Sequence, residues 1–360
     1  MLDALHRYTM LESPTGDARS LAALAETLES DAAAAGFGTT RERHPAGDHL
    51  LWTLPARDVT GPPVLLLSHY DTVWPVGTLA EMPWSVTGDV VRGPGVYDTK
   101  AGIAALLAAV PRILDRPHPE VRVIVVADEE IGSPTAGDLV RAEAAGAGAV
   151  LGLEPPHPDG ALKTGRRGST RARITVTGVE AHAALDPDAG VSAIDELVDQ
   201  LLRVRALAAP HPVLLNTGTI AGGGRTNVVA GRAHADLGLR FTDPADEKAL
   251  LTALQELAAV RPGATVTTEL LSHRPTWRPG PSGGELLTRL REIAAGIGQP
   301  LDGRPADGAA DTNTTGALGR PTVDGLAPWG GGAHARTEWV SVNGLARRTE
   351  LIFSILTGLV

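Results

Sequence analysis

Five segments of the chain place histidine or carboxylate side chains beside short apolar runs or glycine-rich turns. VLLLSHYD (64–71), VRVIVVADEE (121–130) and AVLGLE (149–154) each end an apolar run in residues of this kind. The other two segments are GPGVYDTKAG (93–102) and GGGAHARTEW (330–339). Buried carboxylates are costly in free energy unless they are protonated, paired or bound to metal, so this accumulation indicates a metal site.

The side chains available to bind that metal are imidazoles and carboxylates, because the chain contains no cysteine. The candidate ligands are His69, Asp98, Glu130, Glu154 and His334. Nitrogen and oxygen ligands of this kind suit zinc at a hydrolytic site, and they also suit cobalt or manganese. Five groups are enough for two ions if one carboxylate bridges them.

Each segment taken alone has a simpler interpretation. A His-x-Asp pattern is often a turn with a solvated aspartate, and an acidic run after a strand is usually a solvated surface. Glu154 stands before two prolines and could begin a loop, and His334 could be a surface residue among glycines. The combination of the five segments, rather than any one of them, favours a functional site.

The apolar runs also predict the architecture that positions these residues. They lack helical periodicity and are separated by helix-like stretches such as KAGIAALLAAVPRIL (100–114). This pattern is typical of α/β proteins in which a mostly parallel sheet is covered by helices on both faces. Ligands of such sheets bind outside the carboxyl ends of the strands, where the polar residues lie here.

The sequence pattern changes near residue 164, where predicted strands alternate polar and apolar residues as half-exposed antiparallel strands do. We therefore expect an inserted α+β domain over 164–273, between two parts of the first domain, 1–163 and 274–360. The predicted element order βαββαβ is that of a ferredoxin-like domain. Its predicted elements are strand 171–178, helix 189–206, strands 213–221 and 231–241, helix 244–260 and strand 264–271.

The sequence resembles the M20 metallopeptidases over nearly its whole length, in particular their glutamate carboxypeptidase and acetylornithine deacetylase branch. The motifs that resemble the family are SHYDTV, GPGVYDTKAG, ADEEIGS, LGLEP and GGGAHARTEW, in the family's order. The resemblance implies a zinc-peptidase catalytic domain that binds two Zn²⁺ ions. It assigns His69, Glu130, Glu154 and His334 as ligands and Asp98 as the ligand that bridges both ions.

The same resemblance implies a hydrolytic mechanism. Glu129 would be the general base beside a zinc-bridging water, and Asp71 would accept the second ring N–H of His69 and orient it. The chain departs from many members at Thr99 and Ala101, where an acidic or amide residue and a glycine are common. Neither position supplies a side-chain ligand in the family.

The inserted domain resembles the family's lid and dimerisation domain. In GVEAHAAL, His182 would reach the active site of the partner subunit and stabilise the oxyanion, which implies a homodimer. Asn227 in GGGRTNVVAG and Arg240 in ADLGLRF would bind the substrate, Arg240 through a carboxylate. His182 and Arg240 could instead be solvent-facing residues beside strands. Asp311, in GAADTN, resembles a family position near the metal site whose role the sequence does not define.

The expected reaction is hydrolysis of an amide bond in a small peptide or an N-acyl amino acid. SHYDTVWPVG and GVEAHAALDPDAGVSAI favour a glutamate carboxypeptidase-like exopeptidase. The alternative on the same scaffold is an N-acyl amino acid deacylase of the acetylornithine or succinyl-diaminopimelate type. A catalytically dead binding scaffold would have lost the base or a ligand, and none is missing. A nucleotide-binding protein would need a third glycine in its fingerprint or a phosphate-binding GxxxxGK[ST] loop.

Composition excludes other classes of partner. The net charge is −10 with no cluster of basic residues, so nucleic acid is not an expected ligand. The longest apolar run, AGIAALLAAV, is far shorter than the roughly 20 residues of a membrane span. The N-terminal residues lack the basic and apolar pattern of a secretion signal, so we expect a cytoplasmic protein.

Overall fold

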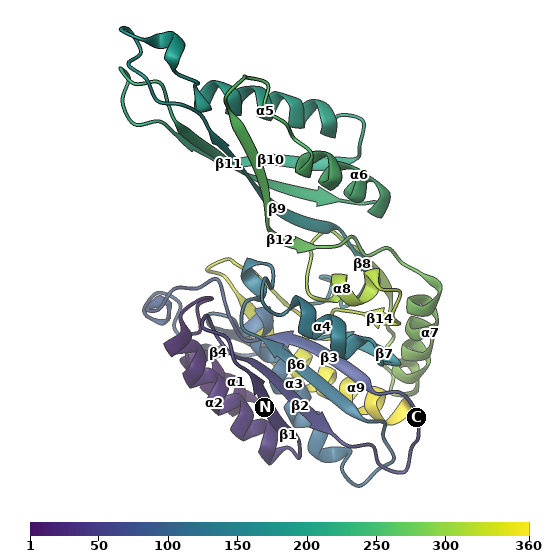
Figure 1. Cartoon of the computed structure of the whole chain (residues 1–360). Helices are drawn as coiled ribbons and strands as arrows, with labels where there is room; N and C mark the ends of the chain where they lie inside the picture. Colours follow the sequence, from purple (N-terminus) through teal and green to yellow (C-terminus); the bar gives the residue numbers. More distant parts are fainter. Residues whose placement is uncertain (360) are drawn as a thin grey trace. The chain divides into compact units, whose positions relative to one another are not determined.

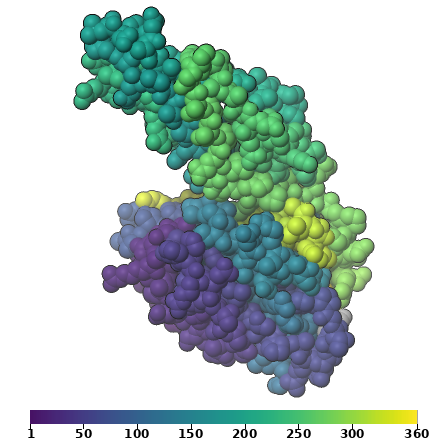
Figure 2. All heavy atoms as spheres, in the orientation of Figure 1, coloured from purple at the N-terminus to yellow at the C-terminus, as the bar shows by residue number. Residues whose placement is uncertain are grey.

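The computed structural model describes residues 1–359, which form two compact units (Figure 1). The first unit contains Met1–Arg166 and the chain from Arg278 onward, and the second contains Arg167–Trp277. The second unit therefore begins at Arg167 rather than at residue 164, and it ends at Trp277 rather than at 273. Figure 2 shows it in teal and green alone, because one continuous middle segment forms it.

The first unit is built on a six-stranded sheet. Its strands, in spatial order, are β1 (Gly38–Glu42), β2 (His49–Leu54), β6 (Val121–Val126), β3 (Val64–His69), β7 (Ala149–Gly152) and β14 (Thr322–Val323). Strands β6, β3, β7 and β14 run parallel to one another, whereas β1 and β2 pair in antiparallel fashion. The predicted α/β class, with a largely parallel sheet flanked by helices, is confirmed.

Helices cover both faces of this sheet, which explains why the central strands are apolar at nearly every position. Along β3, Val64 and Leu66 enter the larger core and Leu65 and Leu67 enter a smaller one. Helix α4 (Gly137–Ala144) covers the smaller core. The helices of the larger core are α1 (Leu2–Met10), α2 (Ala18–Ala34), α3 (Ala101–Ala109), α7 (Pro281–Gly296) and α9 (Val342–Gly358).

A second, four-stranded sheet joins segments of the first unit that are far apart in sequence. Its order is β15 (Gly330–Gly331), β16 (Trp339–Ser341), β5 (Val90–Arg92) and β4 (Ser85–Thr87). Antiparallel pairing of β16 with β5 sets Trp339 opposite Arg92. The remaining short elements are the parallel pair β8 (Leu162–Arg166) and β13 (Gly303–Ala306), and helix α8 (Thr312–Ala317). The pairing of β16 with β15 and β5 anchors the glycine-rich segment that begins at Gly330.

The second unit has the ferredoxin-like order. An antiparallel sheet, β10-β11-β9-β12, packs against two helices through Ile174, Leu197 and Leu237, among others. Its elements are β9 (Gly168–Thr177), α5 (Ala193–Ala208), β10 (Val213–Gly222), β11 (Arg232–Phe241), α6 (Pro244–Gln255) and β12 (Thr265–Arg274).

Both helices of this unit differ from their predicted bounds. Helix α5 begins later than predicted because the Ser192 hydroxyl accepts a hydrogen bond from the Asp195 N–H and caps it. Helix α6 ends at Gln255, five residues before the predicted end at 260. Within residues 1–359, no helix is both long enough and apolar enough to cross a membrane.

Candidate metal centre

Three parallel strands deliver their C-terminal residues to one edge of the main sheet. Strand β3 ends at His69, and Glu154 follows β7 by two residues. Strand β6 leads into a short 3₁₀ turn, Glu129–Ile131. Because β3, β6 and β7 run in the same direction, their carboxyl ends bring these side chains together.

The other two candidate ligands come from loops. Asp98 lies in the turn Val96–Lys100, directly before α3. His334 lies between β15 and β16 and has a φ of 58°, which few residues other than glycine adopt. Such backbone conformations persist where the surrounding structure holds them, as the β15–β16 pairing does here.

Asp98 lies between the two histidines. Its Oδ1 is 3.1 Å from His69 Nε2, and its Oδ2 is 3.5 Å from His334 Nε2. Glu154 Oε1 lies 3.4 Å from His69 Nε2, and Glu130 Oε2 lies 3.0 Å from His334 Nε2. Two three-residue groups result, His69–Asp98–Glu154 and Asp98–Glu130–His334, and the ligand atoms within each lie within 4.8 Å of one another.

The chemistry of these groups fits bound divalent cations. Burial alone would favour neutral His69, but its hydrogen bonds with Asp71, Asp98 and Glu154 outweigh burial and hold its pKa well above the usual value. Burial would likewise raise the pKa of Asp98, yet the hydrogen bond with His69 lowers it. The groups therefore stabilise positive charge between them. Asp98 places one carboxylate oxygen in each of the two groups.

Asp71 ties His69 to the turn that contains the proposed base. Its carboxylate oxygens accept the main-chain N–H groups of Glu129 at 3.1 Å and of Glu130 at 3.2 Å, and the Thr15 hydroxyl at 2.7 Å. His69 Nδ1 is 3.0 Å from the main-chain carbonyl oxygen of Asp71 and 3.4 Å from its carboxylate. The nearer acceptor for the ring is thus the main chain, whereas the sequence led us to expect the carboxylate.

Glu338 is a buried carboxylate that the sequence analysis missed. One oxygen accepts the N–H of Tyr97 at 2.9 Å and of Asp98 at 3.1 Å. The other accepts the Gly95 N–H and the Trp74 indole N–H, each at 2.9 Å. Three of these bonds fix the Asp98 turn to the segment that follows His334, and the bond from Trp74 adds the loop after β3. Glu338 lies inside the GGGAHARTEW motif, but its partners are main-chain groups that no sequence pattern reveals.

Arg166 and Asp324 form a buried pair beside Glu154, and the sequence analysis missed both. Two guanidinium nitrogens of Arg166 donate to Asp324 Oδ2, at 2.6 and 2.8 Å, and Nη2 also lies 4.0 Å from Glu154 Oε2. A Cβ at Gly152 would lie 2.1 Å from Asp324 Oδ1, so only glycine fits there. Arg166 thus places a fixed positive charge behind a candidate ligand.

The positions that the sequence left open have local contacts. The Thr99 hydroxyl donates to the Leu153 carbonyl oxygen, which ties the Asp98 turn to the strand end before Glu154. Asp311 accepts a hydrogen bond from the Ser133 hydroxyl, in the turn that follows Glu130. The first contact stabilises the turn that contains Asp98, and the second stabilises the turn that follows Glu130.

In the second unit, two loops bring His182 and Asn227 together. The Ala183 N–H donates to the Asn227 carbonyl oxygen at 3.0 Å, and both side chains are exposed. The main-chain N–H groups of Ala184 and Leu185 donate to His182 Nδ1 at 3.2 and 3.1 Å. In the neutral ring Nε2 must therefore carry the hydrogen, so His182 presents a donor.

Arg240 lies at the opposite end of the second unit. It is on β11, opposite Ser169 of β9, eight residues or roughly 26 Å along the strand from Arg232. No carboxylate within residues 1–359 lies within 4 Å of its guanidinium. Burial, and then the nearby Arg274, lower its pKa. Arg240 is therefore available to bind an anion.

Comparison with known proteins identifies the family of this chain. The family model described as peptidase family M20/M25/M40 matches residues 65–358.

The chain belongs to this peptidase family. Carboxypeptidase G2 from Pseudomonas sp. (strain RS-16) is 29% identical over 371 residues, covering 100% of this chain and 89% of the relative. A succinyl-diaminopimelate desuccinylase from Gluconacetobacter diazotrophicus is 30% identical over 261 residues, covering 65% of this chain and 66% of the relative.

Solved structures show the same fold. A tripeptidase from Staphylococcus aureus superposes with a TM-score of 0.74 at 22% identity, covering 99% of this chain and 96% of the other. An M20 family metallo-carboxypeptidase from Sulfolobus solfataricus has a TM-score of 0.74 at 16% identity, covering 100% and 99%. This M20 peptidase is therefore a metal-dependent hydrolase, as the sequence predicted, and its candidate ligands form one cluster.

Glu338 provides a test of how the centre is positioned. We expect Glu338→Gln to weaken metal binding by about 10- to 100-fold, because removing a hydrogen-bond partner behind a ligand typically has that effect. Competition with a chromophoric chelator measures the affinity without a substrate. The control is Glu350→Gln, at a half-buried carboxylate of α9 that pairs with Arg112 and is not a candidate ligand, and this variant should keep wild-type affinity. Unchanged affinity in Glu338→Gln would show that the Asp98 turn holds its position without this carboxylate.

Proposed function

We propose that this M20 peptidase uses two zinc ions to hydrolyse a small peptide as a glutamate carboxypeptidase-like exopeptidase. The observation that supports this most directly is the position of Asp98, whose two oxygens face different histidines at 3.1 and 3.5 Å. His69 and Glu154 would complete one ion site, and Glu130 and His334 the other. Cobalt or manganese would suit the same ligands.

Glu129 is the proposed general base. It is buried, and its main-chain N–H is fixed by Asp71 while the adjacent Glu130 is a candidate ligand. When bound, the metal ions supply Lewis-acid activation of a water and of the scissile carbonyl. Glu129 takes a proton from the attacking water while the oxygen of that water bonds to the carbonyl carbon. It then delivers that proton to the amine nitrogen as the C–N bond breaks, leaving a carboxylic acid and an amine.

His182 is the proposed donor to the oxyanion of the tetrahedral intermediate. Its Nε2–H is left free for this by the two main-chain bonds to Nδ1. His182 and Asn227 lie at one end of the second unit and Arg240 lies at the other. Because His182 and Asn227 lie together, we propose that both act in the active site of the partner subunit.

The proposed homodimer has a suitable surface in the second unit. Strand β10 is the edge of its sheet and exposes Leu214 and Ile220 at 60% and 57%. Helix α5, on the same unit, exposes Val198 and Leu202 at 46% and 58%. An open strand edge beside exposed apolar side chains is suited to pairing with a second copy.

The substrate proposal depends on Arg240 and on the relatives. A guanidinium without an acidic partner suits bidentate binding of a C-terminal carboxylate. Carboxypeptidase G2 matches the whole of this chain, which favours an exopeptidase. The second candidate is a deacylase of succinylated or acetylated amino acids, because desuccinylases match about two thirds of the chain at similar identity. The cytoplasmic location stays a prediction from the sequence.

Removing the base tests the assigned chemistry. We expect Glu129→Ala to bind metal as the wild type does but to lose about 10²- to 10⁴-fold in kcat, since a general base contributes on that scale. Metal analysis of the purified protein and turnover measurements give the two quantities. Glu130→Ala, one residue away, should instead lose metal. Full turnover by Glu129→Ala would contradict the role of this carboxylate.

Mixing variants tests whether His182 acts between subunits. We expect His182→Ala to be inactive, and activity to return when it exchanges subunits with Glu129→Ala. In the mixed dimer, an active site with an intact Glu129 from the first variant receives an intact His182 from the second. The control is His182→Ala mixed with the double variant, which offers no such combination. Activity that fails to return in the first mixture would contradict action across the dimer.

A further inference from the structure

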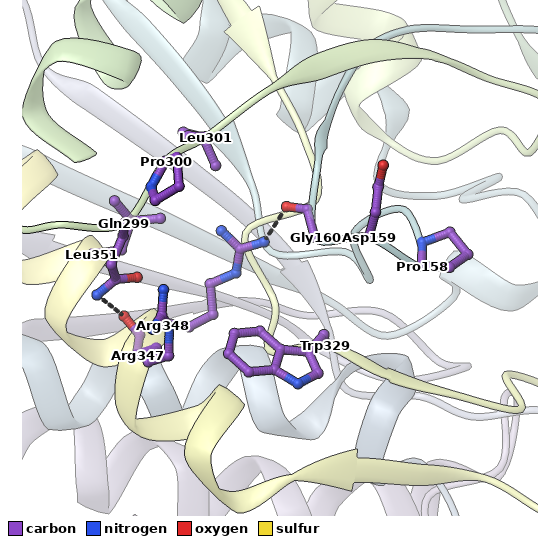
Figure 3. A pocket seen from close by; sticks show the side chains of 10 residues that line it. All are labelled: Pro158, Asp159, Gly160, Gln299, Pro300, Leu301, Trp329, Arg347, Arg348 and Leu351. Atoms are coloured by element: carbon purple, nitrogen blue, oxygen red, sulfur yellow. Dashed lines mark hydrogen bonds between the residues drawn. The ribbon is translucent and has the colours of Figure 1, made fainter. Parts of the chain in front are cut away.

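The first unit contains a cavity of about 310 Å³ that none of the candidate metal ligands lines. Figure 3 shows its walls, which come from the loop Pro158–Gly160, the segment Gln299–Leu301, Trp329 and the helix α9. The α9 residues that face it are Arg347, Arg348 and Leu351. This volume is at the lower limit of small-molecule sites and is large enough for a compact ligand.

Arg348 places a charge in this wall although only 4% of the residue is exposed. Its Nε donates to the Ala327 carbonyl oxygen at 3.0 Å, and its Nη2 donates to the Gly160 carbonyl oxygen at 2.8 Å. Nη1 has no acceptor within residues 1–359, and it is not among the enclosed polar atoms. Figure 3 shows the guanidinium of Arg348 among the other residues that line the cavity, with its bond to Gly160.

The positive charge of the cavity has no acidic partner in the described chain. No carboxylate within residues 1–359 lies within 4 Å of the guanidinium of Arg348 or of its neighbour Arg347. Asp159 is the one acidic residue in the wall, and Arg304 binds it through hydrogen bonds of 2.8 and 3.0 Å. Burial, and then Arg347, lower the pKa of Arg348 to about 10, so it is still protonated at neutral pH.

Part of the wall is apolar, beside the polar residues Gln299 and Asp159. The Arg347 guanidinium lies over the Trp329 ring, 5.7 Å from its centroid. Pro300, Leu301 and Leu351 complete this part of the wall. A buried charge that lacks an opposite charge is unfavourable, and an anion with an apolar body would satisfy both the guanidinium and the apolar surface.

We propose that this cavity is a binding site for a small organic anion, a carboxylate attached to a compact apolar group. The carboxylate accepts hydrogen bonds from Nη1 of Arg348 and from Arg347, and the apolar group packs on Trp329. The site is separate from the metal centre, so this proposal does not depend on the proposed hydrolytic reaction.

Calorimetry on the metal-loaded protein tests the proposal with benzoate and its neutral isostere benzamide. We expect one benzoate to bind per chain, at least about tenfold more tightly than benzamide, because the charge-assisted bonds are lost with the neutral ligand. Arg347→Gln should weaken the affinity for benzoate by about tenfold. Arg347 is exposed, so this change leaves both main-chain bonds of Arg348 intact. The matched control is Arg19→Gln at another exposed arginine, which should not change the affinity.

A variant of the metal centre separates the two sites. His334→Ala should bind benzoate as the wild type does. Equal affinity for benzoate and benzamide would overturn the proposal. Loss of binding in His334→Ala with full binding in Arg347→Gln would overturn it as well, because benzoate would then occupy the metal centre. Inorganic phosphate serves as a third probe, and binding of phosphate in place of benzoate would contradict the role of the apolar wall.

Discussion

Mutual repulsion of three carboxylates is the constraint around which the first unit is organised. Asp98, Glu130 and Glu154 meet at the carboxyl edge of the parallel sheet, where burial removes much of the screening by water. Two imidazoles, His69 and His334, alternate with them and offset part of the negative charge. Bound cations would offset the rest. Asp98 belongs to both three-residue groups, which is why we propose two ions rather than one.

A rigid frame holds these groups against their repulsion. Asp71 and Glu338 are carboxylates outside the two donor groups, and both accept main-chain N–H bonds from segments that contain a candidate ligand. Arg166 adds a positive charge fixed by Asp324. Such bonds restrict the loops that contain the candidate ligands and so hold like charges near one another.

The sequence predicted the sheet and the cluster because both depend on local pattern. The apolar run before His69 is short and lacks helical period, and parallel strands must place such ends at one edge. The family motifs then supplied Asp98 and His334, which lie in loops. Glu338 and Arg166 could not be predicted this way, since the partners of Glu338 lie about 240 residues earlier and that of Arg166 lies 158 residues later. The ends of helices were also predicted incorrectly, because a capping residue such as Ser192 sets where a helix begins, whereas the apolar periodicity only indicates that a helix is present.

The most direct test of metal-dependent amide hydrolysis is amine release, followed by mass spectrometry, from C-terminal glutamyl peptides, dipeptides and N-acyl amino acids. Metal-stripped and zinc-reloaded protein would be compared on the same panel. The account predicts cleavage by the reloaded protein alone, with glutamyl peptides cleaved fastest. Cleavage of the panel by metal-free protein, or no cleavage by protein shown to contain two zinc ions, would contradict it.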